Sequence, residues 1–302
     1  MKEILKITAS LTAVCVAASL ILGAVYTQTV QPRKEIERAE KEEIIKGLLG
    51  FGHGKQIPPD LSVRSIYRYV INEPSTGTLL GYVVPVKDDK HALATIDLAG
   101  KPVKVFPLEQ KAADLVDSGS RDAAVVAVLP KGSKATFADA FYVADVGAKR
   151  LGCVIPGITQ GFKTFVKLMV SVDPEFTVTG VAITESEEDP GLGAEIQQNY
   201  FKNQFMGKTV DMLKTLEVVK EPLPPDYLAA LDPAKAKKAG LKPEQLDEIR
   251  KKHVKDNIYA LTGATISSAA VTRGVKDTVR KFVYRFDILK KAIEEEKIQV
   301  AF

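Results

Sequence analysis

The feature that most restricts the fold of this chain is an uncharged run near its N-terminus. Every residue from Ile7 to Tyr26 is apolar or small. An α-helix rises about 1.5 Å per residue, so twenty residues cross the roughly 30 Å hydrocarbon core of a bilayer. We predict a retained single-pass transmembrane anchor at residues 7–27, after a short tail at 1–6. A cleaved signal peptide has a shorter apolar core and a small-x-small site, and Val14 before Cys15 is a poor fit to a lipoprotein site.

A charged helical segment is expected to follow the apolar run. Pro32 suits a first helical turn, and the pattern continues to Leu49. Glycines at 50, 52 and 54 and the Pro58-Pro59 pair then mark a break. We therefore predict a helical stalk at residues 28–60. Lysines and arginines flank both ends of the apolar run, so charge alone leaves the orientation of the anchor open.

The composition is that of a globular domain without an obvious catalytic centre. The chain has 302 residues, 45% of them hydrophobic and 26% charged, with a net charge of +4. Lysine and glutamate are interspersed, which disfavours a nucleic-acid partner. Cys15 and Cys153 form no disulfide framework, and His53, His91 and His253 lack metal-ligand spacing. We predict no metal site, and the chain has no nucleophile-elbow, phosphate-loop or dinucleotide motif.

The remainder, residues 61–302, has the pattern of an α+β domain. Strand-like segments alternate with turns at Ser65–Asn72, Leu80–Val86, Thr164–Val172 and Thr177–Ile183. A helical repeat of apolar residues then begins at Val271 and continues through Val275, Val279, Phe282, Phe286, Leu289 and Ile293. The predicted fold class is thus α+β, with an antiparallel sheet and flanking helices behind one transmembrane helix.

A tight loop comes directly before that long helix. Its sequence is Leu261-Thr262-Gly263-Ala264-Thr265-Ile266-Ser267-Ser268, and we expect Ser267 or Ser268 to be the N-cap. The start of a helix offers free N–H groups and a partial positive charge, which suit a phosphate. On composition alone, this segment is an ordinary turn with a cap.

A second loop precedes it in the chain. Residues 185–196 combine an acidic run with Pro190, while Gly191 and Gly193 permit unusual φ values and close approach to a flat ligand. Taken alone, this too is an ordinary turn beside a solvated acidic face.

Both segments together resemble the FMN-binding domain family. Thr262-Gly263-Ala264-Thr265-Ile266-Ser267-Ser268 is similar to the flavinylation motif of that family, which includes the G subunit of the Rnf electron transport complex and the C subunit of the sodium-pumping NADH:quinone reductase. The resemblance implies that Thr265 carries FMN through a phosphoester bond made by a flavin transferase, and that Thr262, Gly263 and Ala264 shape the loop. Thr262 stands where serine is common in the family.

The second loop resembles the family pattern His-x-Glu-Thr-Pro-Gly-Leu-Gly. The match covers Glu188, Pro190, Gly191, Leu192 and Gly193, whereas Ser186 replaces the histidine and Asp189 the threonine. The resemblance implies that the isoalloxazine ring lies near Glu188, Asp189, Gly191, Leu192 and Gly193. A carboxylate at Asp189 is expected to lower the flavin potential, because it disfavours added negative charge.

The resemblance covers the anchor and a covalent-FMN region at about residues 143–281. Within it, residues 217–254 are a predicted insertion, which is either a partner contact or an inert excursion.

These expectations combine into one functional hypothesis. The resemblance implies an electron-transfer subunit with covalent FMN in an Rnf-type ion-translocating ferredoxin:NAD oxidoreductase, not catalytic alone. Its partners are the other membrane subunits and the flavin transferase. The resemblance also places residues 1–6 as a cytoplasmic tail, the anchor in the inner (cytoplasmic) membrane and the flavin domain on the extracytoplasmic side. The alternatives are a covalent-FMN domain of another extracytoplasmic redox system, and a non-redox membrane-anchored binding or scaffold protein.

Overall fold

The chain forms two units. The computed structural model describes residues 1–52, 54–87 and 89–302, so His53 lies outside the described residues. The first unit is Met1–Gly47 and the second is Leu48–Phe302.

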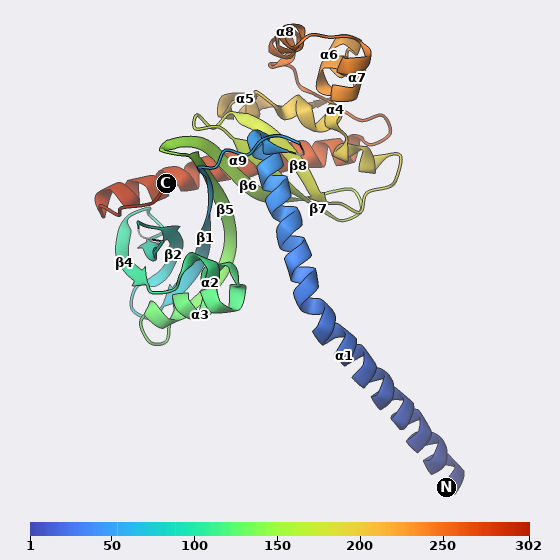
Figure 1. Ribbon diagram of the computed structural model, residues 1–302, viewed down its shortest axis with the longest axis vertical. Helices are drawn as coiled ribbons and strands as arrows, with labels where there is room; N and C mark the ends of the chain where they lie inside the picture. The colour runs from blue at the N-terminus through green and yellow to red at the C-terminus, as the bar shows by residue number, and fades with distance from the viewer. Residues whose placement is uncertain (53, 88) are drawn as a thin grey trace. The chain divides into compact units, whose positions relative to one another are not determined.

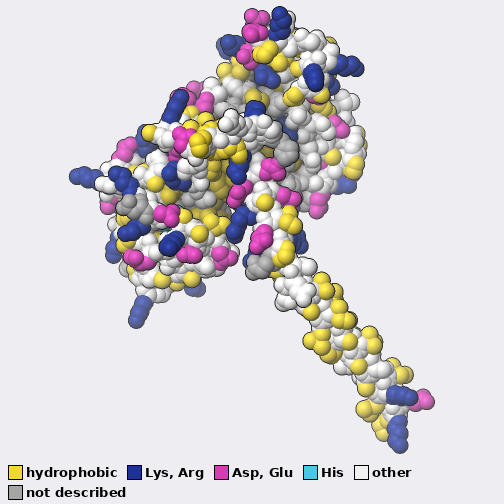
Figure 2. Space-filling model, viewed as in Figure 1, with side chains coloured by type: hydrophobic (Ala, Val, Ile, Leu, Met, Phe, Trp, Pro, Cys, Tyr) yellow, Lys and Arg dark blue, Asp and Glu magenta, His cyan; other side chains and the backbone are white. Residues whose placement is uncertain are grey.

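The first unit is a single helix, α1 (Lys2–Lys46), which is long and apolar enough to cross a membrane. Figure 2 shows hydrophobic side chains around the N-terminal part of this helix. The prediction that a new helix starts at Pro32 is wrong, because Pro32 lies inside α1. Proline removes one backbone hydrogen bond, but residues 33–46 after it are mostly strong helix formers, and Arg33 Nε bonds Glu37 Oε1 at 2.9 Å one turn later. The predicted break is present, since a π-helical turn at Gly47–Phe51 contains Gly50 at φ 94°.

The second unit is built on one eight-stranded antiparallel sheet (Figure 1). The strand order is β4-β3-β2-β1-β5-β6-β7-β8, which is two four-stranded meanders joined where β1 pairs with β5. The strands are β1 (Leu61–Glu73), β2 (Gly77–Pro85), β3 (His91–Ile96), β4 (Pro102–Leu108), β5 (Lys134–Val146), β6 (Lys149–Gln160), β7 (Phe165–Val172) and β8 (Val178–Glu185). The α+β prediction with an antiparallel sheet is confirmed.

One face of the sheet is covered by the long helix α9 (Thr265–Glu295), seen in red in Figure 1. Its buried side chains enter the larger core with residues of both meanders, among them Tyr82 and Leu168. The apolar spacing predicted from the sequence places Val271, Val275, Val279, Phe282, Phe286 and Leu289 in this core. Contact with β6 is close at Gly157, where a β-carbon would collide with the Thr278 hydroxyl.

The opposite face of the first meander carries two short helices, α2 (Ala112–Val116) and α3 (Ser118–Val128). Side chains alternate between the faces of a strand. Tyr82 and Ala92 therefore belong to the α9 core, while Val83 and Leu93 belong to a second, smaller core with Leu115 of α2. This second core gives the first meander an interior of its own.

Short elements connect the sheet to α9. They are η2 (Gly193–Gln197), α4 (Asn199–Lys202), η3 (Asn203–Phe205), α5 (Val210–Thr215), β9 (Val218–Val219), α6 (Pro225–Leu231), α7 (Pro233–Lys238), α8 (Pro243–His253) and β10 (Ile258–Tyr259). Strands β9 and β10 pair in parallel, so the segment 217–254 leaves and rejoins the domain at one place. It is a folded helical segment, in which the His253 ring stacks on Tyr227 with 4.5 Å between centroids.

Candidate functional site

The candidate site begins at the first turn of α9. The helix starts at Thr265, after Ala264 at φ −131°, and no side chain caps it. The prediction of a serine N-cap is therefore wrong. Ser268 lies inside the first turn instead: its hydroxyl accepts from the Leu261 N–H at 3.0 Å and donates to the Ala264 carbonyl at 2.9 Å. This buried serine therefore links the first turn of the helix to the backbone of the preceding loop.

The loop presents its threonines to solvent. Thr265 is partly exposed, and Thr262 and Gly263 are exposed, whereas Ala264 is buried. Gly263 has φ 76°, a left-handed conformation that favours glycine. The reversal that it permits brings Thr265 to the N-terminus of a 31-residue helix, where unpaired N–H groups and the helix dipole favour a phosphate.

Glu188 of the second loop is buried and fully engaged with the protein. Its Oε1 accepts from the backbone N–H of Phe162 at 2.8 Å and of Lys163 at 3.3 Å. Its Oε2 accepts from the Ser267 hydroxyl in the first turn of α9. Ser186, at the family's histidine position, accepts from the Glu188 N–H at 3.3 Å. Glu188 therefore joins three segments, the β6–β7 turn, the second loop and the first turn of α9.

The two loops touch each other where they lack side chains. A β-carbon at Gly193 would lie 2.9 Å from the Ser267 hydroxyl, and one at Gly263 would lie 2.9 Å from Cδ2 of Leu192. Gly191 has φ 73° with open space around it. The structure thus brings the two sequence motifs together, although 79 residues separate Glu188 from Ser267.

The negative charge of Asp189 is balanced by a neighbouring lysine. Its carboxylate forms an ion pair with Lys163, and both side chains are partly exposed. Hydrogen bonding to Asp189 raises the pKa of Lys163. The Asp189 carbonyl also accepts from the N–H groups of Leu192 at 3.1 Å and Ala194 at 3.0 Å. Lys163 therefore reduces the field that Asp189 exerts on a nearby group.

Large apolar side chains stand exposed on the segments that Glu188 joins. The exposed fractions are 57% for Phe162, 48% for Leu192 and 59% for Ile266. Exposed apolar side chains of this kind can pack against a planar aromatic ligand. Sequence reasoning misses Phe162 and Lys163. Their only signal is the hairpin turn after Gly161, which does not reveal a contact with Glu188.

The described residues contain no group of three or more His, Cys, Asp or Glu side chains that could hold a metal ion.

Comparison with known proteins locates both motifs in one domain. Residues 161–280 match the model of the FMN-binding domain. The G subunit of the proton-translocating ferredoxin:NAD(+) oxidoreductase complex of Clostridium ljungdahlii is 33% identical over 141 residues, which are 47% of this chain and 58% of that protein. The G subunit of the Na(+)-translocating ferredoxin:NAD(+) oxidoreductase complex of Acetobacterium woodii is 29% identical over 42% of this chain and 46% of that protein. The chain thus matches about half the length of these relatives.

A solved structure, NqrC of Shewanella oneidensis, aligns with a TM-score of 0.47 at 18% identity, covering 84% of this chain and 98% of that one. Over residues 161–280, this chain is similar to the FMN-binding domain family.

Proposed function

We propose that this protein is a membrane-anchored flavoprotein subunit that carries covalent FMN on Thr265 and relays electrons within an ion-translocating ferredoxin:NAD oxidoreductase complex. The observation that carries the proposal is the contact between the two motifs. The partly exposed Thr265 begins α9, and the loop before it packs against Leu192 of the second motif.

The chain's own residues supply attachment and orientation. The Thr265 hydroxyl is the acceptor of the phosphoester, and the N-terminus of α9 stabilises the phosphate charge. Gly263 leaves the approach to that hydroxyl open, because its exposed position carries no side chain. Glu188 and Ser267 fix the distance between the helix start and the second loop.

The flavin, when bound, supplies reversible electron transfer, and the protein supplies binding, orientation and electrostatics. Phe162, Leu192 and Ile266 are the apolar contacts expected beside the ring. The attachment by phosphate leaves the ring free and raises the effective concentration of the cofactor, because the cofactor never dissociates.

The apolar helix α1 supports the membrane anchor. We propose that the anchor lies in the cytoplasmic membrane, with the flavin domain on the extracytoplasmic side. The relatives named above are subunits of ion-translocating complexes, which supports other membrane subunits as partners and a flavin transferase for maturation. An alternative within the same chemistry is a covalent-FMN domain of another redox system, and co-purifying subunits separate the two.

The experiment that tests the proposal is co-expression of the full chain with a flavin transferase, followed by a denaturing gel under ultraviolet light. We expect a fluorescent band and, by mass spectrometry, FMN on the peptide that contains Thr265. Thr265→Val should abolish both signals. The matched control is Thr215→Val, an exposed threonine at the end of α5 and outside both loops, which should keep them. A dark wild-type band would overturn the proposal.

A further inference from the structure

Strand β1 has an open edge in the interior of the sheet. It pairs with β5 along residues 61–72, but β2 pairs with it only at residues 67–73. Over residues 62–66, none of the described strands pairs with the other edge of β1. Successive residues of an antiparallel strand direct their N–H and C=O groups to opposite sides. Every second residue of this stretch therefore offers both groups to a further strand.

The end of β2 does not close this edge. Pro85 ends the strand and has no N–H, and its carbonyl accepts from the Ala301 N–H at 3.0 Å. Val86 then forms a bridge with Val300 in the same C-terminal segment. The chain at the end of β2 is thus paired with the C-terminal segment, and β1 has no neighbour there.

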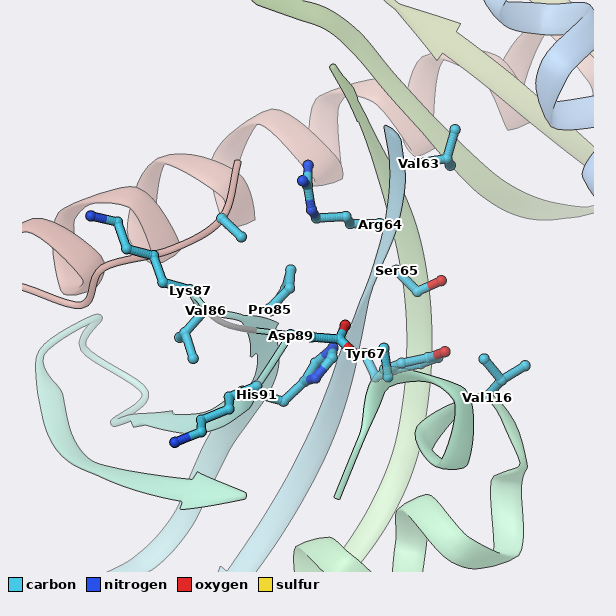
Figure 3. A pocket seen from close by; sticks show the side chains of 13 residues that line it. Val63, Arg64, Ser65, Tyr67, Pro85, Val86, Lys87, Asp89, His91 and Val116 are labelled. Carbon is cyan, nitrogen blue, oxygen red and sulfur yellow. The ribbon is translucent and has the colours of Figure 1, made fainter. Parts of the chain in front are cut away.

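A pocket of about 350 Å³ lies along the open edge (Figure 3). It is lined by β1, the end of β2 and α2, through Val63, Arg64, Ser65, Pro85, Val86 and Val116 among others. Residues 61–65 are partly exposed, so solvent reaches the edge. Such a volume admits a short extended segment and excludes a folded domain. None of the lining lies within residues 161–280, so the pocket is separate from the flavin site.

The side chains of β1 beside the pocket alternate between the two faces of the sheet. Ile66 belongs to the core under α9 and Tyr67 to the second core, so Arg64 lies on the α9 face and Ser65 on the α2 face. Figure 3 shows Arg64 and Ser65 on opposite sides of β1. Residues opposite each other on paired strands touch on the same face. A segment paired with β1 would place one side chain beside Arg64 and its two neighbours on the face of Val116.

The charge around Arg64 favours an acidic side chain at that position. Asp145 is shared by two guanidinium groups, with Oδ2 at 3.0 Å from Nη1 of Arg64 and Oδ1 at 3.7 Å from Nε of Arg150. The Arg64 side chain is 32% exposed and lines the pocket. A second carboxylate beside Arg64 would balance the second positive charge.

We propose that an extended peptide segment of a partner protein adds as a strand to residues 62–66 of β1. The segment presents an acidic side chain to Arg64, and the apolar residues before and after it face Val116 and the pocket. In strand addition, main-chain hydrogen bonds provide affinity and the alternate side chains provide specificity. The site is independent of whether Thr265 carries FMN.

The test uses displayed octapeptides with a central apolar-Glu-apolar triad and random flanks, selected on the full chain in nanodiscs of zwitterionic lipid. Recovered peptides should bind Val116→Glu at least about tenfold more weakly, because a carboxylate then stands beside the pocket. The matched control is Val126→Glu, an exposed valine of α3 outside the pocket, which should change the affinity less than about twofold. If no peptide is recovered, or none distinguishes these two variants, the proposal is wrong.

The peptide itself provides a second arm. N-methylation of every second residue should weaken binding about tenfold or more when the methylated nitrogens face β1, since those hydrogen bonds are lost. Shifting the methyl groups by one residue should restore binding, because the other nitrogens face away from β1. Replacing the central Glu by Lys should also weaken binding. Equal affinity of the two methylated peptides would overturn the proposal.

Hydrogen exchange locates the bound peptide on β1. Ser62 and Ser65 are three residues apart, so their amides point to opposite sides and only one of them bonds β5. With ¹⁵N-serine labelling, and with Ser62→Ala and Ser65→Ala for assignment, the peptide should slow exchange of the other amide about tenfold or more. A peptide that binds without slowing either amide would overturn the proposal. So would a dimer of the full chain that Val116→Glu dissociates, since the edge would then pair with a second copy.

Discussion

The Ser267 hydroxyl donates a hydrogen bond to Oε2 of Glu188, 79 residues earlier in the chain. The other oxygen of the same buried carboxylate accepts from the Phe162 N–H at 2.8 Å. One side chain thus joins the start of α9, the second loop at residues 185–196 and the β6–β7 turn. The relative position of the two flavin motifs depends on it.

Glu188→Gln should destabilise the protein and reduce flavin incorporation. The amide cannot accept on both sides, so a buried donor loses its partner, which costs about 2–3 kcal/mol. For a domain of this size, that free energy corresponds to a fall in Tm of about 5–10 °C. Thermal unfolding of the full chain in detergent measures the stability, and in-gel fluorescence measures the flavin.

Two variants control this prediction. Glu187→Gln changes the same charge at an exposed neighbour and should leave Tm unchanged. Ser267→Ala removes one donor and should cost about 1 kcal/mol. A Glu188→Gln protein as stable and as fluorescent as wild type would show that the carboxylate does not hold the site.

The role of Glu188 illustrates what the sequence can predict. The motif around it is recognisable from residue types, and strands β1, β2, β7 and β8 and helix α9 follow from local patterns. The partners of its carboxylate are distant in sequence, so no local pattern reveals that it bonds Ser267. Likewise, the local preference of Pro32 predicts a helix start, but the helix-forming residues that follow it outweigh the loss of one hydrogen bond.

Gly263→Ala should impair both stability and flavin incorporation more than Gly191→Ala. The two glycines have nearly equal φ values of 76° and 73°, so each alanine substitution carries the same backbone penalty of about 1 kcal/mol. Only at Gly263 does the new β-carbon meet a neighbour, Cδ2 of Leu192 at 2.9 Å. Paired measurements of Tm and of gel fluorescence compare the two.

The double variant Leu192→Ala with Gly263→Ala isolates that contact. Removing the leucine methyl groups should recover the excess loss of stability of Gly263→Ala, leaving the backbone penalty. If Gly263→Ala and Gly191→Ala behave alike, the close approach of the two loops has no energetic consequence.

The ion pair of Asp189 sets the size of its expected effect on the flavin. Asp189→Thr should raise the reduction potential, because a negative charge near the ring opposes reduction. Lys163 compensates that charge at a partly exposed position, so the effect should stay below about 1 kcal/mol, the energy of two unit charges at 4 Å in water. Lys163→Gln should shift the potential downward. Spectroscopic redox titration of both variants measures the shifts, and no upward shift in Asp189→Thr would refute the effect.

The second core marks the limit of sequence reasoning. Local patterns predict strands in the first meander, but they do not predict α2 and α3. The distance in sequence between His91 and the other histidines argues against a metal site and says nothing else about its surroundings. The periodicity of β3 is obscured because all six of its residues are buried, so the strand shows no alternation of polar and apolar positions. Which face His91 occupies therefore becomes visible only with the sheet.

Lys208 should make the protein more stable as the pH rises. Its side chain is almost completely buried and donates to the carbonyls of Val254 at 2.9 Å and Asp256 at 2.7 Å. Burial lowers its pKa to about 8, whereas an unfolded lysine titrates near 10.4. Between these values the unfolded chain binds more protons, so the free energy of unfolding increases with pH. The expected gain from pH 7 to 9.5 is about 2 kcal/mol.

Denaturant unfolding of the full chain at several pH values between 7 and 9.5 measures this gain. Lys208→Met should lower the stability at every pH, because two carbonyls lose their donor, and should flatten the slope. Burial also lowers the pKa of Lys202, so Lys202→Met serves as the control that shows how much of the slope belongs to the second lysine. Tyrosines such as Tyr227, whose pKa burial raises, act in the opposite sense only above about pH 10, because an unfolded tyrosine titrates there. A slope that survives unchanged in Lys208→Met would mean that this ammonium is not the group that titrates.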